Sequence, residues 1–209
     1  MSDAHRAEPA RDTGESAITL DAPDELGSAG LRPDPDAYFM RIALAVRSRA
    51  SCTGRRVGAV IVRESRILST GYNGTPSKMR NCADGGCHRC AHPEEYPSGE
   101  GYDVCICVHA EQNALLAAAR FGVAVAGCTM YTTLQPCFGC LKELLQADVR
   151  EVCYLQPWTS RFADVYAALI DRLGAANFRR VLIDDPDARW ALGRAGSAPA
   201  ERGLGHEIL

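Results

Sequence analysis

The order of apolar and polar positions divides the middle of the chain into short strands and amphipathic helices. A β-branched apolar run at 57–62 and a second strand-like segment at 67–72 flank the polar residues 63–66 and predict a hairpin. Helical and strand-like segments then alternate. We expect one helix to begin at Ala37, with Asp36 as its N-cap, and three more at 110–121, 137–147 and 161–173. The strands between and after these helices are expected at 128–133, 149–155 and 178–183.

This order predicts an α/β fold, a three-layer α/β/α sandwich around a mixed, roughly five-stranded sheet. Residues 1–33 and 186–209 have no sustained apolar period, so we expect them to be tails around a domain at 34–185. Residues 80–107 form a Cys-, Gly- and Pro-rich insert. Such a long irregular stretch within a compact domain needs a restraint besides apolar packing.

Composition narrows the class of protein. With 209 residues, 46% of them hydrophobic and 23% charged, the chain fits one globular domain. We find neither a run of the ~20 apolar residues that a membrane helix requires nor a secretion signal, so we expect a cytoplasmic protein without a membrane partner. A net charge of -3 argues against a nucleic-acid binder. Ten cysteines without an export signal indicate metal binding rather than disulfides.

Two short motifs, each at the start of a predicted helix, carry the candidate chemistry. His109 precedes Glu111 by two positions, and Cys137 and Cys140 follow Pro136 as a Cys-x-x-Cys pair. One histidine and two thiolates suit zinc, and three ligands leave a fourth position open for water. A carboxylate beside that water can move protons. A closed structural zinc site or a redox pair would give Glu111 no role, and H-x-E with P-C-x-x-C is the signature of zinc deaminases.

Residues 36–160 resemble deoxycytidylate (dCMP) deaminases, a branch of the zinc-dependent cytidine deaminase superfamily. Free-nucleoside cytidine deaminases share only the two metal-site motifs, and tRNA adenosine deaminases usually lack the long Cys-rich insert. The segments that carry the resemblance are VGAVIV (57–62), GYNGTP (71–76), NC (81–82), GCHRC (86–90), CICVHAEQNA (105–114) and YTTLQPC (131–137).

The resemblance implies hydrolysis of dCMP to dUMP and ammonia. It makes His109, Cys137 and Cys140 ligands of a catalytic zinc and Glu111 the acid and base. Relatives often carry a basic residue where this chain has Gly54, which leaves recognition of the 5′-phosphate less defined than the chemistry. The substrate-binding candidates are Asn73, Gly74, Thr75 and Ala110 near the sugar and base, with Arg55, Arg56, Lys78 and Tyr154 near the phosphate.

Further expectations also come from the resemblance. It implies a homo-oligomer, a hexamer by analogy, with dCTP bound with Mg²⁺ as activator and dTTP as inhibitor between subunits. It also implies a structural zinc beside the catalytic one. We expect one such ion, and two sets of cysteines could bind it. Relatives favour Cys52, Cys82, Cys87 and either Cys105 or Cys107, whereas spacing alone would allow Cys87, Cys90, Cys105 and Cys107.

Three alternatives remain. The same chemistry could act on CMP, a 5-substituted dCMP or dCTP in specialised or defence metabolism. A polynucleotide deaminase would need a basic groove for a flipped base, which the acidic balance disfavours. An inactive zinc-bound interaction module would have no use for Glu111.

Overall fold

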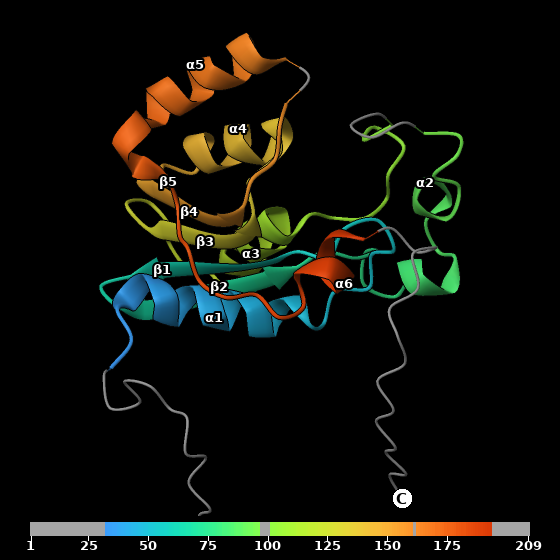
Figure 1. The fold of residues 1–209 in the computed structure, drawn as a ribbon, viewed down its shortest axis with the longest axis horizontal. Helices are drawn as coiled ribbons and strands as arrows, with labels where there is room; N and C mark the ends of the chain where they lie inside the picture. The colour runs from blue at the N-terminus through green and yellow to red at the C-terminus, as the bar shows by residue number, and fades with distance from the viewer. Residues whose placement is uncertain (1–31, 97–100, 161, 194–209) are drawn as a thin grey trace, which may run out of the picture. The chain divides into compact units, whose positions relative to one another are not determined.

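The computed structural model describes residues 32–96, 101–160 and 162–193, and a five-stranded sheet forms the middle layer (Figure 1). The strands are antiparallel where β1 meets β2 and β3, and parallel from β3 through β4 to β5. The predicted α/β class with a mixed five-stranded sheet is thus confirmed. In spatial order the strands are β2 (Arg66–Tyr72), β1 (Gly58–Arg63), β3 (Thr129–Leu134), β4 (Glu151–Gln156) and β5 (Phe178–Arg180).

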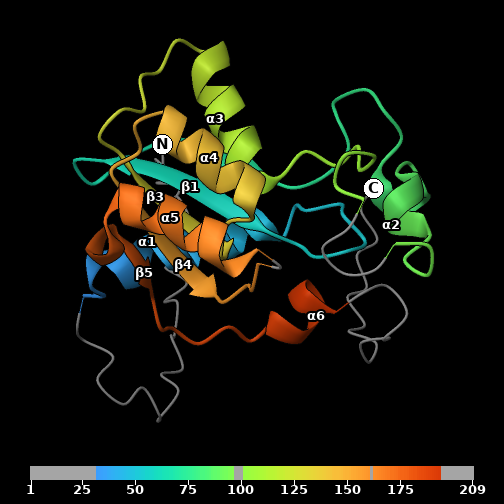
Figure 2. The ribbon, with the colours of Figure 1, turned by 90° about the horizontal axis from the view of Figure 1, so that it is seen from above.

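Helices cover both faces of this sheet. Helix α1 (Pro35–Arg47) packs on one face, and α3 (Ala110–Arg120) and α4 (Phe138–Gln146) pack on the other, with α5 (Ala163–Leu173) against α4 (Figures 1 and 2). No helix among the described residues is long and apolar enough to cross a bilayer. The short helical segments are Cys82–Asp84, α2 (His88–Ala91), Ala175–Asn177 and α6 (Ala188–Leu192).

Strand β1 lies at the centre of both cores. Ala59 and Ile61 pack with α3 and α4, whereas Val60 and Val62 pack with α1. A strand buried on both faces has no polar side to alternate with. This explains why the sequence shows an unbroken apolar run here.

The start of α1 differs from the sequence prediction. Asp34 is the N-cap, because its side chain accepts a hydrogen bond from the Ala37 N–H at 3.0 Å. The prediction that Asp36 caps this helix is therefore wrong. The Asp36 carboxylate instead accepts hydrogen bonds from the Tyr131 hydroxyl (2.8 Å) and from Arg179 (2.9 Å), and so connects α1 to β3 and β5.

Packed structure also continues beyond residue 185, where the sequence analysis places the start of a tail. The Arg56 N–H donates to the carbonyl of Ala191 at 2.8 Å, and the Arg56 guanidinium donates to the carbonyl of Trp190 at 2.9 Å. The same guanidinium lies 4.6 Å from the centre of the Trp190 ring. These contacts fix α6 and bury Ala191.

Strand β5 ends at Arg180, three residues earlier than predicted. The remaining tail residues, 1–31 and 194–209, lie outside the described ranges.

Candidate active site

Two helix N-termini bring the candidate zinc ligands together. His109 is the N-cap residue of α3, and Cys137 is the N-cap residue of α4, with Cys140 in the first turn. Nδ1 of His109 lies 3.3 Å from Sγ of Cys137 and 3.3 Å from Sγ of Cys140. All three ligand atoms lie within 4.8 Å of one another.

These distances fit zinc. With bonds of ~2.0–2.1 Å to nitrogen and ~2.3 Å to sulfur, the nitrogen–sulfur edges of a tetrahedron are about 3.6 Å long. The charges also fit a cation. The hydrogen bond from the Cys140 thiol, with one from His109, lowers the pKa of Cys137 to about 4 against the effect of burial. Although burial lowers the pKa of His109, the hydrogen bond to Cys137 raises it to about 9. A bound metal ion replaces such protons.

Glu111 lies beside these three ligands. Its side chain is almost fully buried, and this burial raises the pKa of the carboxyl group. The hydroxyl of Thr132, on β3, donates a hydrogen bond of 3.2 Å to one Glu111 oxygen and so restricts the direction of the carboxylate. A raised pKa makes the carboxylate a better proton acceptor, which suits a group that must take up a proton and pass it on.

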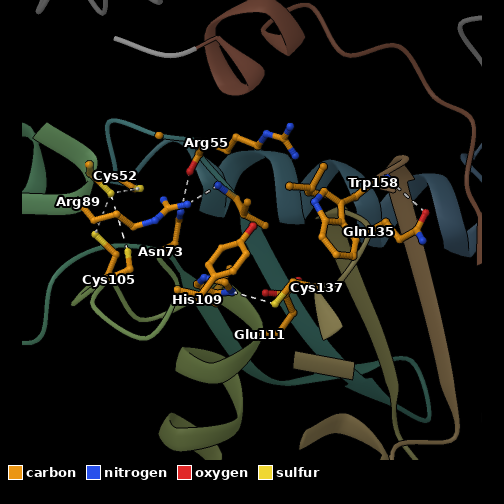
Figure 3. A pocket seen from close by; sticks show the side chains of 17 residues that line it. Cys52, Arg55, Asn73, Arg89, Cys105, His109, Glu111, Gln135, Cys137 and Trp158 are labelled. Atoms are coloured by element: carbon orange, nitrogen blue, oxygen red, sulfur yellow. Dashed lines mark hydrogen bonds between the residues drawn. The ribbon is translucent and has the colours of Figure 1, made fainter. Parts of the chain in front are cut away.

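A pocket opens above this centre, and His109, Glu111 and Cys137 form part of its wall (Figure 3). Asn73 lines it as well. The side-chain oxygen of Asn73 accepts a hydrogen bond from the Val57 N–H (2.8 Å), and the side-chain NH₂ group donates to the backbone carbonyl of Arg55 (2.6 Å). These bonds use one of two N–H groups and one of two oxygen lone pairs, so the amide retains capacity toward a ligand.

Some of the predicted substrate-binding residues lie in or beside this pocket, and others lie away from it. Arg55 and Ala110 line the pocket with Asn73. Gly74 lies next to it and pairs with Val108 through hydrogen bonds of 2.9 and 3.2 Å, which attach the loop 73–76 to the segment that carries His109. Thr75 follows in the same loop and is partly buried.

Three predicted phosphate partners are not among the pocket-lining residues. Arg56 contacts α6, as described above. Lys78 is exposed in the turn after the loop 73–76. Tyr154 lies on β4, where its ring packs against Phe178 with ring centres 5.1 Å apart.

Several pocket residues were missed by the sequence analysis. The Arg89 guanidinium lies 4.9 Å from the centre of the Tyr102 ring, and that ring stands edge-on to His109 at 5.8 Å. On the other side, Gln135 accepts a hydrogen bond from the backbone N–H of Trp158 at 3.3 Å. The position of Gln135, two residues before Cys137, could have indicated it. The others come from distant segments and give no local signal.

Known proteins resemble this chain in sequence and in fold. A family model described as the cytidine and deoxycytidylate deaminase zinc-binding region matches residues 33–156. Among curated proteins, the deoxycytidylate deaminases of Saccharomyces cerevisiae and Mycobacterium phage D29 are 44% identical over 128 residues and 38% identical over 126 residues. These matches cover 61% and 59% of this chain.

The coverage of the relatives differs. The match spans only 39% of the Saccharomyces cerevisiae protein and 41% of the Schizosaccharomyces pombe protein, but 95% of the phage D29 protein. Among solved structures, the dCMP deaminase of cyanophage S-TIM5 in complex with dCMP and dUMP is 28% identical, with a TM-score of 0.55. That similarity covers 72% of this chain and 99% of the cyanophage chain.

Proposed function

This chain belongs to the cytidine and deoxycytidylate deaminase zinc-binding family, and we propose on that premise that it converts dCMP and water to dUMP and ammonia. One observation carries the proposal: buried Glu111 lies beside a His109, Cys137 and Cys140 triad that leaves a fourth zinc position open. Curated relatives named as deoxycytidylate deaminases and the cyanophage structure with dCMP and dUMP support dCMP as the substrate.

Residues of this chain supply the proton transfers. When bound by His109, Cys137 and Cys140, zinc would lower the pKa of a water molecule toward ~7. Glu111 would take a proton from that water as oxygen adds to C4 of the cytosine ring, and would deliver it to N3. Glu111 would then pass the second proton to the amino group, which leaves as ammonia while C4 keeps the oxygen as a carbonyl. Thr132 would hold the carboxylate in place during both transfers.

The pocket offers partners for the rest of a nucleotide. Asn73 is placed to bind the sugar, with Ala110 in the wall beside it. A 5′-phosphate requires cationic donors. We assign that part to Arg55, predicted from the sequence, and to Arg89, which extends from α2 into the pocket (Figure 3).

The finer features rest on the family resemblance. We propose a cytoplasmic homo-oligomer, a hexamer by analogy, in which dCTP with Mg²⁺ activates and dTTP inhibits. We also propose that the cysteine-rich insert binds structural zinc, because its cysteines converge in space. A membrane partner or a nucleic-acid partner is not part of this proposal.

The test is ammonia release by the purified zinc-loaded chain. The substrates are dCMP, CMP, deoxycytidine and dCTP, each with and without dCTP–Mg²⁺ or dTTP, and Glu111→Gln is the inactive control. Turnover that is fastest with dCMP supports the proposal. Preference for CMP or dCTP would instead establish the same chemistry on another nucleotide. No turnover with zinc in place would contradict a deaminase function.

A further inference from the structure

The core of the cysteine-rich insert consists of sulfur. Five cysteines from this region are buried in contact with one another, and a sixth is partly buried against them. Within the described residues, this cluster contains no aliphatic or aromatic side chain. Short segments without an apolar core need another source of folding free energy. The members are Cys52, Cys82, Cys87, Cys90, Cys105 and Cys107.

These six thiols form two overlapping sets of four. In each set, all four sulfur atoms lie within 4.8 Å of one another. Cys90 and Cys107 belong to both sets. The first set adds Cys52 and Cys82, and the second adds Cys87 and Cys105.

The sulfur–sulfur distances match the edges of zinc tetrahedra. With zinc–sulfur bonds of ~2.3 Å, a tetrahedron has edges of about 3.8 Å. The separations are 3.7 Å for Cys52–Cys90, 3.8 Å for Cys87–Cys105, 3.9 Å for Cys90–Cys105 and 4.0 Å for Cys90–Cys107. A disulfide has a sulfur–sulfur distance of ~2.05 Å, so none of these pairs is bonded.

We propose that the six cysteines bind two zinc ions in one Zn₂Cys₆ cluster, with the sulfur atoms of Cys90 and Cys107 bridging the two ions. Each ion then has four sulfur ligands, two bridging and two terminal. Six thiols lose six protons as two Zn²⁺ ions bind, which leaves a net charge of -2 on the cluster. A single ion would leave two of these cysteines without a metal ligand role, although each of the six belongs to a set of four sulfur atoms within 4.8 Å of one another.

Neighbouring groups suit a thiolate cluster. The backbone N–H of Thr53 donates to Sγ of Cys82 at 3.4 Å, and the Thr53 hydroxyl lies 3.6 Å from the same sulfur. The hydroxyl also donates to the carbonyl of Cys90 at 3.3 Å, which connects one terminal ligand to one bridging ligand. Hydrogen bonds of this kind orient metal ligands and stabilise their charge.

The cluster is part of the active-site wall, although its existence does not depend on the proposed activity. Cys52, Cys90, Cys105 and Cys107 line the pocket together with His109. Cys107 precedes His109 by two residues, and Val108 between them pairs with Gly74. Metal binding at Cys107 therefore fixes the position from which α3 and its zinc ligand begin.

The test is the metal content of the full chain, measured by mass spectrometry of purified zinc-loaded protein, together with zinc X-ray absorption. We expect three zinc ions per chain, two in the cluster and one at the triad, with zinc–zinc scattering. Two ions with zinc–zinc scattering would still support the cluster while contradicting the catalytic centre. Two or fewer ions without zinc–zinc scattering would overturn the proposal.

Two double variants provide a symmetric second test. Cys52→Ser/Cys82→Ser leaves the second set complete, and Cys87→Ser/Cys105→Ser leaves the first set complete. Each variant should lose one zinc ion per chain and the zinc–zinc scattering. If either double variant kept the full wild-type zinc content, the cluster would hold only one ion and the proposal would fail.

The control is Cys128→Ala, which removes a buried thiol from the main core rather than from the cluster. Its zinc content should equal that of the wild type. The wild-type measurement decides the proposal even if a double variant does not fold.

Discussion

Gly71 offers a direct way to displace α3, the helix at whose start His109 and Glu111 lie, without changing either side chain. It lies in β2 where this strand packs against α3. A Cβ atom at this position would stand 2.1 Å from the carbonyl oxygen of Ala110 and 2.4 Å from the nitrogen of Ala114. Both contacts are with backbone atoms, so no side chain can rotate away in Gly71→Ala.

The size of the effect follows from these distances. A Cβ atom does not come closer than 3.0 Å to a backbone oxygen, so the strand and the helix must separate by about 0.9 Å. Ala110 lies between His109 and Glu111, so the movement falls on the first turn that carries both. A misplacement of ~1 Å can reduce the rate about 10²-fold. That corresponds to ~2.7 kcal/mol of transition-state stabilisation, besides ~1–3 kcal/mol of lost folding stability from overpacking.

The assay compares kcat/KM for ammonia release from dCMP with stability in urea. The matched control is Gly58→Ala, whose Cβ would stand 2.2 Å from the carbonyl oxygen of Ala43 on α1, at the opposite face of the sheet. Both variants should lose similar stability, but only Gly71→Ala should lose about 10²-fold in kcat/KM. Equal activity losses in the two variants, or wild-type activity in Gly71→Ala, would refute this reasoning.

Three further predictions follow from other contacts. Glu111→Gln should keep its zinc and lose about 10²–10⁴-fold in kcat for ammonia release, because general acid–base catalysis is removed, and wild-type turnover would contradict the mechanism. Arg47→Met should cost about 3–5 kcal/mol in urea unfolding, because the buried carboxylate of Asp185, 2.6 Å from Arg47, loses its cationic partner; a change below ~1 kcal/mol would contradict this. The hydrogen bond from Arg179 lowers the pKa of Asp36 in the folded protein. The stability that this ion pair adds is complete above the unfolded-state pKa of ~3.9 and is lost as the pH falls through the lower pKa of the folded protein. Asp36→Asn should therefore make the free energy of unfolding depend less on pH in acid, and an unchanged slope would contradict the assignment.

Local patterns carried much of the fold and the centre of the site. The unbroken apolar run of β1 and the polar turn after it predicted the hairpin that the structure contains. His109 and Glu111, and likewise Cys137 and Cys140, are close in sequence, so their motifs specify each half of the site before any tertiary structure is known. The fold then only has to bring two helix N-termini together.

Long-range contacts decided the features that the sequence did not predict. Asp34 and Asp36 can both cap a helix, and only the contacts of Asp36 with Tyr131 and Arg179 assign it elsewhere. The helix α6 has too few residues to show a period, and its contact with Arg56 stabilises it. Arg89 and Trp158 reach the pocket from segments on opposite sides of α3 in the sequence.

The all-cysteine core of the insert has a thermodynamic consequence. Heat capacity increases on unfolding mainly because apolar surface becomes exposed, and this small core of thiols has little such surface to expose. Its stability should depend on the free zinc concentration through mass action, whereas the sandwich around the sheet follows the ordinary temperature dependence of apolar burial. The two regions need not unfold in one transition, so a melting temperature of this protein is defined only at a stated zinc activity.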